Sequence, residues 1–184
     1  MLSLLLLLVA LPLASAVELP GDSIYRLPLV LVDQNGHAQQ LVERRGKPQL
    51  ISMFYTSCQY VCPLIIDSLR KTRLALTPAE RSKLDVLLVS FDPERDTPAR
   101  LKQVFAERKL DASGWTLART DAADVRKLAA MLDIQYRALA SGDFNHSTAL
   151  ILLDADGRVV ARTDKLGAAD AEFVAAIQRT LVPR

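Results

Sequence analysis

Hydrophobic and polar positions follow two different patterns along this chain. Continuous apolar runs at residues 48–55 and 84–91 are typical of strands that are buried on both faces of a sheet. Elsewhere apolar residues recur every three or four positions, which predicts amphipathic helices that cover such a sheet. The predicted helices begin at Cys62, after Thr77, after Thr97, after Asp121 and after Asp170.

Two turn signals add β-hairpins to this pattern. Residues 24–32 alternate imperfectly and run into the turn Asp33–Gly36, and strand-like runs at 149–153 and 158–161 flank the turn Asp154–Gly157. The order is a hairpin, a strand–helix–strand unit, further helices, two strands and a final helix. This order predicts an α/β fold: a thioredoxin-like sandwich of mixed strands with an N-terminal β-hairpin and a helical insertion.

The first sixteen residues have a different character. Leu2–Leu13 is an almost unbroken apolar run, and Ala14–Ala16 has the small-x-small pattern of a secretory cleavage site. A membrane helix needs about 20 apolar residues, so residues 1–16 are predicted to be a signal peptide or a short anchor. Residues 17–184 are then predicted to form a single domain. We expect an exported, periplasmic protein that is soluble or tethered to a membrane by its N-terminus.

Composition narrows the function classes. The chain has 184 residues, half of them hydrophobic, which is enough for one domain with a full core. Its formal net charge is +2, and no basic run stands out. Nucleic acid is therefore not expected among its partners.

Cys58 and Cys62, the only cysteines, lie between a buried-strand run and a helix. In an exported protein a cysteine pair is by default a disulfide. A bridge across three residues removes little chain entropy, however, so a purely structural role is not favoured. The helix dipole and the free amides of the first helical turn favour a thiolate. A thiolate can attack a disulfide or bind a soft metal, and position alone does not choose between these roles.

Two histidines could complete a metal site. His37 follows an Asn-Gly turn, where a solvated surface imidazole is the ordinary outcome. His146 lies just before the run at 149–153, in a loop that would face the cysteine turn in a thioredoxin arrangement. The alternative for His146 is a polar loop residue without a ligand role. The sulfur atoms of Met53 and Met131 are soft ligands in principle, but both residues occupy apolar periodic positions and are expected in the core.

Three segments together resemble the signatures of the Sco/SenC family. They are Tyr55–Pro63 with its two cysteines, Phe91–Pro98, and the loop of His146. The resemblance spans essentially the whole chain after the predicted signal peptide. It implies a copper-handling protein of thioredoxin fold that serves assembly of the CuA centre of cytochrome c oxidase. Oxidase subunit II, or a periplasmic copper carrier, is the partner that it implies.

The resemblance also implies roles for particular residues. Cys58, Cys62 and His146 would bind copper, as Cu(I) or Cu(II), and Asp92 would belong to the outer region of the site. Soft Cu(I) accepts two thiolates and an imidazole, and Cu(II) could use the same groups with a water molecule. A salt bridge to Arg95 is the alternative role of Asp92.

The chain departs from the family pattern at two places. Many members have Pro-Asp where this chain has Gln59-Tyr60, and many have an acidic residue where it has Asn145. Neither departure removes a ligand, but both change the surroundings of the ligands. Asp96 and Thr97 are interpreted as helix-capping residues.

Three functions are compatible with these residues. The first is a copper metallochaperone that delivers its ion by ligand exchange. The second is a thiol-disulfide reductase that keeps the recipient's copper-ligand cysteines reduced, with Cys58 attacking and Cys62 resolving. The third is a peroxiredoxin-type enzyme, which is disfavoured because Tyr55 stands where that class places a threonine. The chaperone is favoured because a reductase does not need His146, and reductase activity is kept as the alternative or as a second role.

Overall fold

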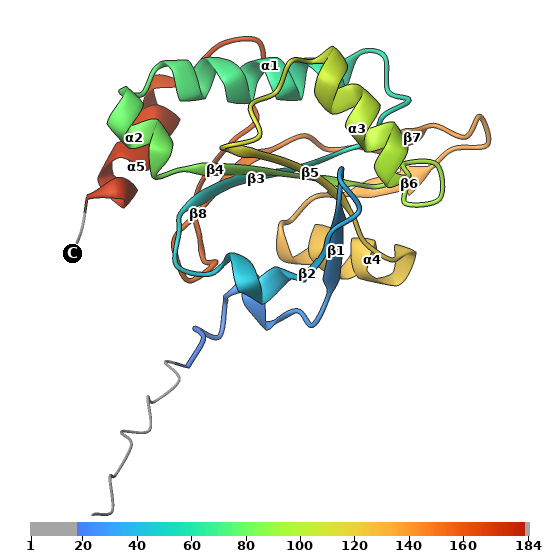
Figure 1. Cartoon of the computed structure of the whole chain (residues 1–184), viewed down its shortest axis with the longest axis horizontal. Coiled ribbons are helices and arrows are strands. Elements are labelled where there is room, and N and C mark those ends of the chain that lie inside the picture. Colours follow the sequence, from blue (N-terminus) through green and yellow to red (C-terminus); the bar gives the residue numbers. More distant parts are fainter. Residues whose placement is uncertain (1–17, 183–184) are drawn as a thin grey trace, which may run out of the picture.

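The computed structural model describes residues 18–182 (Figure 1). The predicted signal peptide therefore lies outside the described residues. The strands are β1 (Val30–Asp33), β2 (Ala38–Gln40), β3 (Gln49–Phe54), β4 (Asp85–Ser90), β5 (Trp115–Arg119), β6 (Tyr136–Ala138), β7 (Phe144–His146), β8 (Leu150–Leu153) and β9 (Val159–Thr163). The α-helices are α1 (Val61–Leu74), α2 (Pro78–Ser82), α3 (Pro98–Glu107), α4 (Ala122–Met131) and α5 (Ala171–Leu181). Two 3-10 helices, η1 (Ile24–Arg26) and η2 (Leu41–Arg44), precede β3.

The centre of the molecule is a mixed sheet with the strand order β2-β1-β5-β4-β3-β8-β9. β4 runs parallel to both β3 and β5, whereas β8 pairs with β3 in the antiparallel direction. Figure 1 shows α1 and α3 on one face of this sheet and α4 on the other. All six residues of β3 are buried, as expected of a strand with a layer on each face. The predicted α/β class with mixed strands and an N-terminal hairpin is confirmed.

The sequence pattern failed at three places. Residues 24–32 were predicted to be strand-like throughout, but η1 occupies the first three of them because the side chain of Ser23 caps the backbone amide of Tyr25. The strand β5 was not predicted. The hairpin of β6 and β7 was not predicted either, so His146 ends a short strand instead of lying in a loop.

The predicted helix starts are correct, but the capping roles expected of Asp121 and Asp96 are not present as predicted. Thr77, Thr97 and Asp170 each accept a hydrogen bond from a backbone amide in the first turn of their helix. Asp121 occupies the capping position of α4, but its side chain makes no capping hydrogen bond. Asp96 is not a cap: Thr97 occupies the capping position of α3, and the side chain of Asp96 is almost fully buried.

The carboxylate of Asp96 joins the segments that follow β3 and β4. It accepts hydrogen bonds from the backbone amide of Thr56 at 3.0 Å, from the hydroxyl of Thr56, and from the hydroxyl of Ser90. Burial raises the pKa of Asp96, and these hydrogen bonds act in the opposite direction. The carboxylate thus fixes the backbone two residues before Cys58.

Replacing Asp96 with alanine should destabilise the protein. The buried hydroxyl of Ser90 and the half-buried donors of Thr56 would lose their acceptor, and a buried group left unsatisfied costs about 1–3 kcal/mol. Urea unfolding of the reduced, metal-free protein measures this loss. The matched control is Asp121→Ala, an exposed aspartate without a side-chain cap, which should change the unfolding free energy by no more than about 0.5 kcal/mol. Equal effects of the two substitutions would contradict the role given to Asp96.

In the part of the chain that the structure describes, the helices are too short or too polar to cross a membrane.

Candidate metal centre

The two cysteines lie where β3 passes into α1. Cys58 is in the turn after β3, and Cys62 is the second residue of α1, as the sequence predicted. The side chain of Cys62 is buried, whereas that of Cys58 is half-buried, and both thiols are free. The predicted reactive pair therefore has one accessible sulfur and one sulfur that is covered by the core.

Backbone amides point at both sulfur atoms. The amide of Cys62 donates to Sγ of Cys58 at 3.3 Å, and the amide of Tyr55 donates to Sγ of Cys62 at 3.4 Å. The first contact exists because α1 begins here, so that the amides of its first turn have no helical acceptor. Gln59 and Tyr60, which depart from the family pattern, are both exposed.

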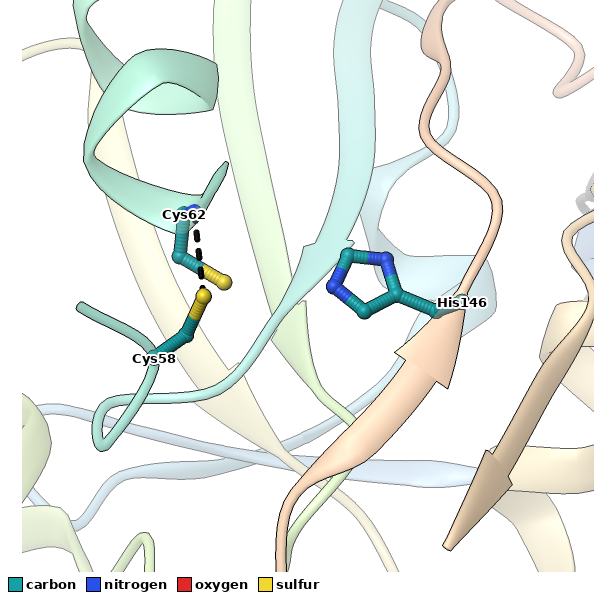
Figure 2. Close-up of side chains that lie close together, drawn as sticks. All are labelled: Cys58, Cys62 and His146. Atoms are coloured by element: carbon teal, nitrogen blue, oxygen red, sulfur yellow. Dashed lines mark hydrogen bonds between the residues drawn. The ribbon is translucent and has the colours of Figure 1, made fainter. Parts of the chain in front are cut away.

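His146 reaches the cysteines from the other side of the site. Sγ of Cys58, Sγ of Cys62 and a ring nitrogen of His146 all lie within 4.8 Å of one another (Figure 2). Two atoms bound to one ion at about 2.3 Å, the usual zinc–sulfur distance, can be at most about 4.6 Å apart. The three side chains are therefore almost at coordination distance, and a small contraction would let one ion touch all of them.

The hydrogen bond of the imidazole indicates which ring nitrogen carries a hydrogen. Nδ1 of His146 lies 3.0 Å from the carbonyl oxygen of Ser147. A carbonyl oxygen can only accept, so Nδ1 carries a proton in this contact, and in the neutral imidazole the free lone pair is then on Nε2. A hydrogen bond of this kind on the distant nitrogen is the usual way to fix a metal-binding histidine.

An aromatic cluster holds the ring of His146 in place. The ring centroid lies 5.1 Å from that of Phe91 and 6.0 Å from that of Tyr55. Phe144, on the same short strand, packs edge-on against Tyr55 at 5.2 Å, and Tyr136 stacks on Phe91 at 4.9 Å. The hairpin of β6 and β7 is thus attached to the residues that directly follow β3 and β4.

Asp92 lies beside this hairpin, but it is not part of the ligand cluster. Its buried carboxylate forms a salt bridge with Arg95, and the guanidinium of Arg95 also donates to the carbonyl oxygen of Gly142 in the β6–β7 turn. The salt bridge that was considered for Asp92 is therefore present, and through Arg95 it reaches the hairpin that carries His146.

The remaining candidates lie away from the cysteines. The side chain of His37 is 80% exposed, as expected of a surface imidazole, and its Nδ1 lies 3.6 Å from the carboxylate of Asp33. Met53 is in the core, as predicted. The prediction for Met131 was wrong: its side chain lies at the last turn of α4 and is partly exposed.

A match to protein-family models covers residues 19–182 and gives the family described as SCO1/SenC. The chain belongs to the SCO1/SenC family. A Stutzerimonas stutzeri protein named for copper binding is 27% identical over 133 residues, which are 70% of this chain and 64% of the relative. The chain thus spans somewhat less than two thirds of that relative's length.

Two solved structures place this SCO1/SenC chain among Sco proteins of known fold. ScoI of Bradyrhizobium japonicum, solved with copper bound, is 29% identical with a TM-score of 0.70, over 83% of this chain and 97% of that one. BsSco, described as a member of the Sco family of cytochrome c oxidase assembly proteins, is 19% identical with a TM-score of 0.70, over 84% and 91% of the two chains. These neighbours confirm the predicted thioredoxin-like fold.

In this SCO1/SenC member the pKa values of the two thiols are shifted in opposite directions. Burial alone would raise the pKa of Cys58, but hydrogen bonds from the backbone amides of Cys62, Tyr60 and Val61 outweigh burial and lower it. Burial raises the pKa of Cys62 far above the usual range, and the neighbouring Cys58 raises it further. The accessible sulfur is therefore the more acidic of the two, and the covered sulfur is the less acidic.

This difference predicts the order of alkylation. In the reduced, metal-free protein, iodoacetamide should modify Cys58 first, and at a lower pH than an ordinary thiol needs, because a lowered pKa leaves more thiolate as pH falls. Cys62 should react slowly until the pH is well above that range. Peptide mass spectrometry across a pH series measures both rates. In Cys58→Ser, Cys62 should remain slow because burial is the main cause of its high pKa; fast alkylation of Cys62 would contradict the assignment.

Proposed function

We propose that this protein binds copper through Cys58, Cys62 and His146 and delivers it to the CuA site of a respiratory cytochrome c oxidase. One observation carries the proposal: side chains far apart in the sequence converge to within 4.8 Å of one another at one end of the sheet. Two sulfurs and a neutral imidazole are the ligands that soft Cu(I) prefers. A water molecule could add a fourth ligand for Cu(II).

The ligand set suits an ion that must be handed on. Cys58 is accessible while Cys62 is covered, so an incoming ligand would meet Cys58 and His146 before Cys62. Exchange can then proceed one ligand at a time, with Cys62 as the last protein ligand to release the ion. The copper-bound ScoI of Bradyrhizobium japonicum, at 29% identity, supports copper as the cargo.

The family and the N-terminal sequence support the recipient and the compartment in this proposal. The family resemblance favours oxidase subunit II as recipient, with a periplasmic copper carrier as the other partner. The apolar run of residues 1–16 supports export to the periplasm, with the mature domain free or tethered to the membrane.

Thiol-disulfide exchange is a second candidate function, because the acidities of the two thiols fit it. Cys58, with its lowered pKa, would attack a disulfide of the recipient and form a mixed disulfide. Cys62 would then attack Sγ of Cys58 and release the reduced recipient. This reaction uses neither nitrogen of His146, so the two functions can be separated by one substitution.

His146→Ala should weaken Cu(I) binding by more than about 100-fold, since losing only a hydrogen-bond partner of a ligand already costs about 10–100-fold. Competition with a chromophoric Cu(I) chelator under anaerobic conditions measures the affinity. His37→Ala, which removes the other histidine of the chain, is the matched control and should bind as the parent does. Unchanged affinity in His146→Ala would exclude a three-ligand site. Thiol counting should show that both cysteines of the variant still oxidise to a disulfide.

Transfer to a recipient tests delivery directly. The copper-loaded protein, mixed with the soluble CuA domain of subunit II in its reduced apo form, should lose copper to that domain, and His146→Ala should not support this transfer. Copper content after separation of the two proteins is the readout. In a second arm the recipient's cysteines are first oxidised. If His146→Ala reduces them as fast as the parent while parent copper stays with the donor, reductase activity is the function and delivery is not.

A further inference from the structure

A pocket of about 310 Å³ lies beside the cysteine pair. Both cysteines line it, together with residues that precede Cys58 and with one side of α3. Neither His146 nor any other residue of the β6–β7 hairpin contributes to its wall. The pair thus lies between two separate approaches, one shared with the imidazole and one through this pocket. The volume is at the lower end of the range for small-molecule sites.

The wall of the pocket carries two half-buried arginines, Arg100 and Arg108. Among residues 18–182, no carboxylate forms an ion pair with either guanidinium. Glu107 also lines the pocket but is exposed and accepts a hydrogen bond from Gln103 instead. The charged side chains of the wall therefore leave an excess of one positive charge in the pocket that Cys58 also lines.

Arg100 is held in position by the turn that carries the cysteines. Its Nε donates to the hydroxyl of Thr56 at 3.2 Å, and one Nη donates to the carbonyl oxygen of Thr56 at 3.5 Å. The other N–H groups of this guanidinium have no acceptor among the described residues. A fixed guanidinium with spare donors is suited to bind a carboxylate, which it can contact through two parallel hydrogen bonds.

We propose that this pocket binds small thiols that carry a carboxylate and admits them to the oxidised cysteine pair. The thiolate of the small molecule attacks Sγ of Cys58, which is the accessible sulfur, and the Cys58–Cys62 bond breaks. Cys62 leaves as a thiolate and takes a proton from water. A second thiolate then attacks the sulfur of the small molecule in the mixed disulfide. The two small thiols become a disulfide, and their two electrons leave Cys58 and Cys62 reduced.

This proposal rests on the dithiol chemistry of the pair and not on copper binding. It assigns the two approaches to different tasks: copper exchange on the side of His146, and renewal of the thiols on the side of Arg100. Renewal matters for either function, because an oxidised pair can neither bind Cu(I) nor reduce a recipient.

Three thiols of similar size but different charge test the pocket. They are 3-mercaptopropionate, 2-mercaptoethanol and 2-mercaptoethylamine, each reacted with the oxidised full-length protein at one pH and ionic strength. Each rate is divided by the rate of the same thiol with an uncharged small disulfide, which removes differences in thiolate content and nucleophilicity. The anionic thiol should be favoured over the neutral one by about 3–10-fold, between the effects of an exposed ion pair and a buried one, and the cationic thiol should be disfavoured.

Substitutions then test whether Arg100 and Arg108 cause the preference for the anionic thiol. Arg100→Gln and Arg108→Gln should each reduce the advantage of 3-mercaptopropionate and leave the rate with 2-mercaptoethanol unchanged, and Arg100→Lys should retain part of it. Arg179→Gln, an equal charge change on the exposed side of α5, is the matched control and should have no effect. Cu(I) affinity equal to that of the parent shows that each variant keeps its site.

The possible outcomes distinguish the thiol-binding pocket from the proposed copper function. Equal normalised rates for the three thiols, or an equal loss in Arg179→Gln, would overturn the pocket and leave copper binding and delivery untouched. A pair that no thiol can reduce would overturn both this pocket and the reductase alternative. Loss of copper transfer in His146→Ala, with thiol selectivity retained, would support the division into two approaches.

Discussion

The site depends on a buried carboxylate that is neither a ligand nor a helix cap. Asp96 ties the turn after β3 to the end of β4 by accepting hydrogen bonds from Thr56 and Ser90. These hydrogen bonds extend the connection between the two segments beyond the last backbone bond of the sheet, from Phe91 to Phe54, at the carboxyl end where α/β proteins place their sites. Burying a charge is costly unless it is well hydrogen-bonded, so the three donors and the carboxylate need one another. These hydrogen bonds help to fix the position of the turn that carries Cys58.

A second set of contacts attaches the hairpin of β6 and β7. Phe91 and Tyr55, which directly follow β4 and β3, pack against the ring of His146, and the pair Asp92–Arg95 reaches the carbonyl of Gly142. Asp92 and Asp96 are thus only four residues apart, but Asp92 contacts the hairpin through Arg95, whereas Asp96 contacts the cysteine turn. The segment that carries both aspartates therefore connects the cysteine turn to the hairpin of His146.

The sequence allowed the fold class and the cysteines to be predicted because both depend on local pattern. The runs that became β3 and β4 are continuous and apolar, and the helix caps are short-range signals. The strand β5 was missed because Trp115–Arg119 is short and includes half-buried polar residues, so that its identity depends on pairing with β4. The β6–β7 hairpin was missed because most of its residues are exposed; the glycine at 142, with its positive φ of 86°, was the available turn signal. Asp96 was taken for a cap because its partners lie in segments that only the folded chain brings near.

His146, the third ligand of the proposed copper site, lies on a small sheet of its own, separate from the strand and helix that carry the sulfurs. An ion held by all three side chains would act as a cross-link, closing a long loop of chain between α1 and β7. Part of its binding energy would then be spent on restricting that loop, although the aromatic contacts reduce the cost by preorganising the hairpin. The proposed delivery of copper also requires that the ion be released. Because the hairpin is outside the main sheet, the imidazole can withdraw while β3 and α1 keep their structure, and release does not require the domain to unfold.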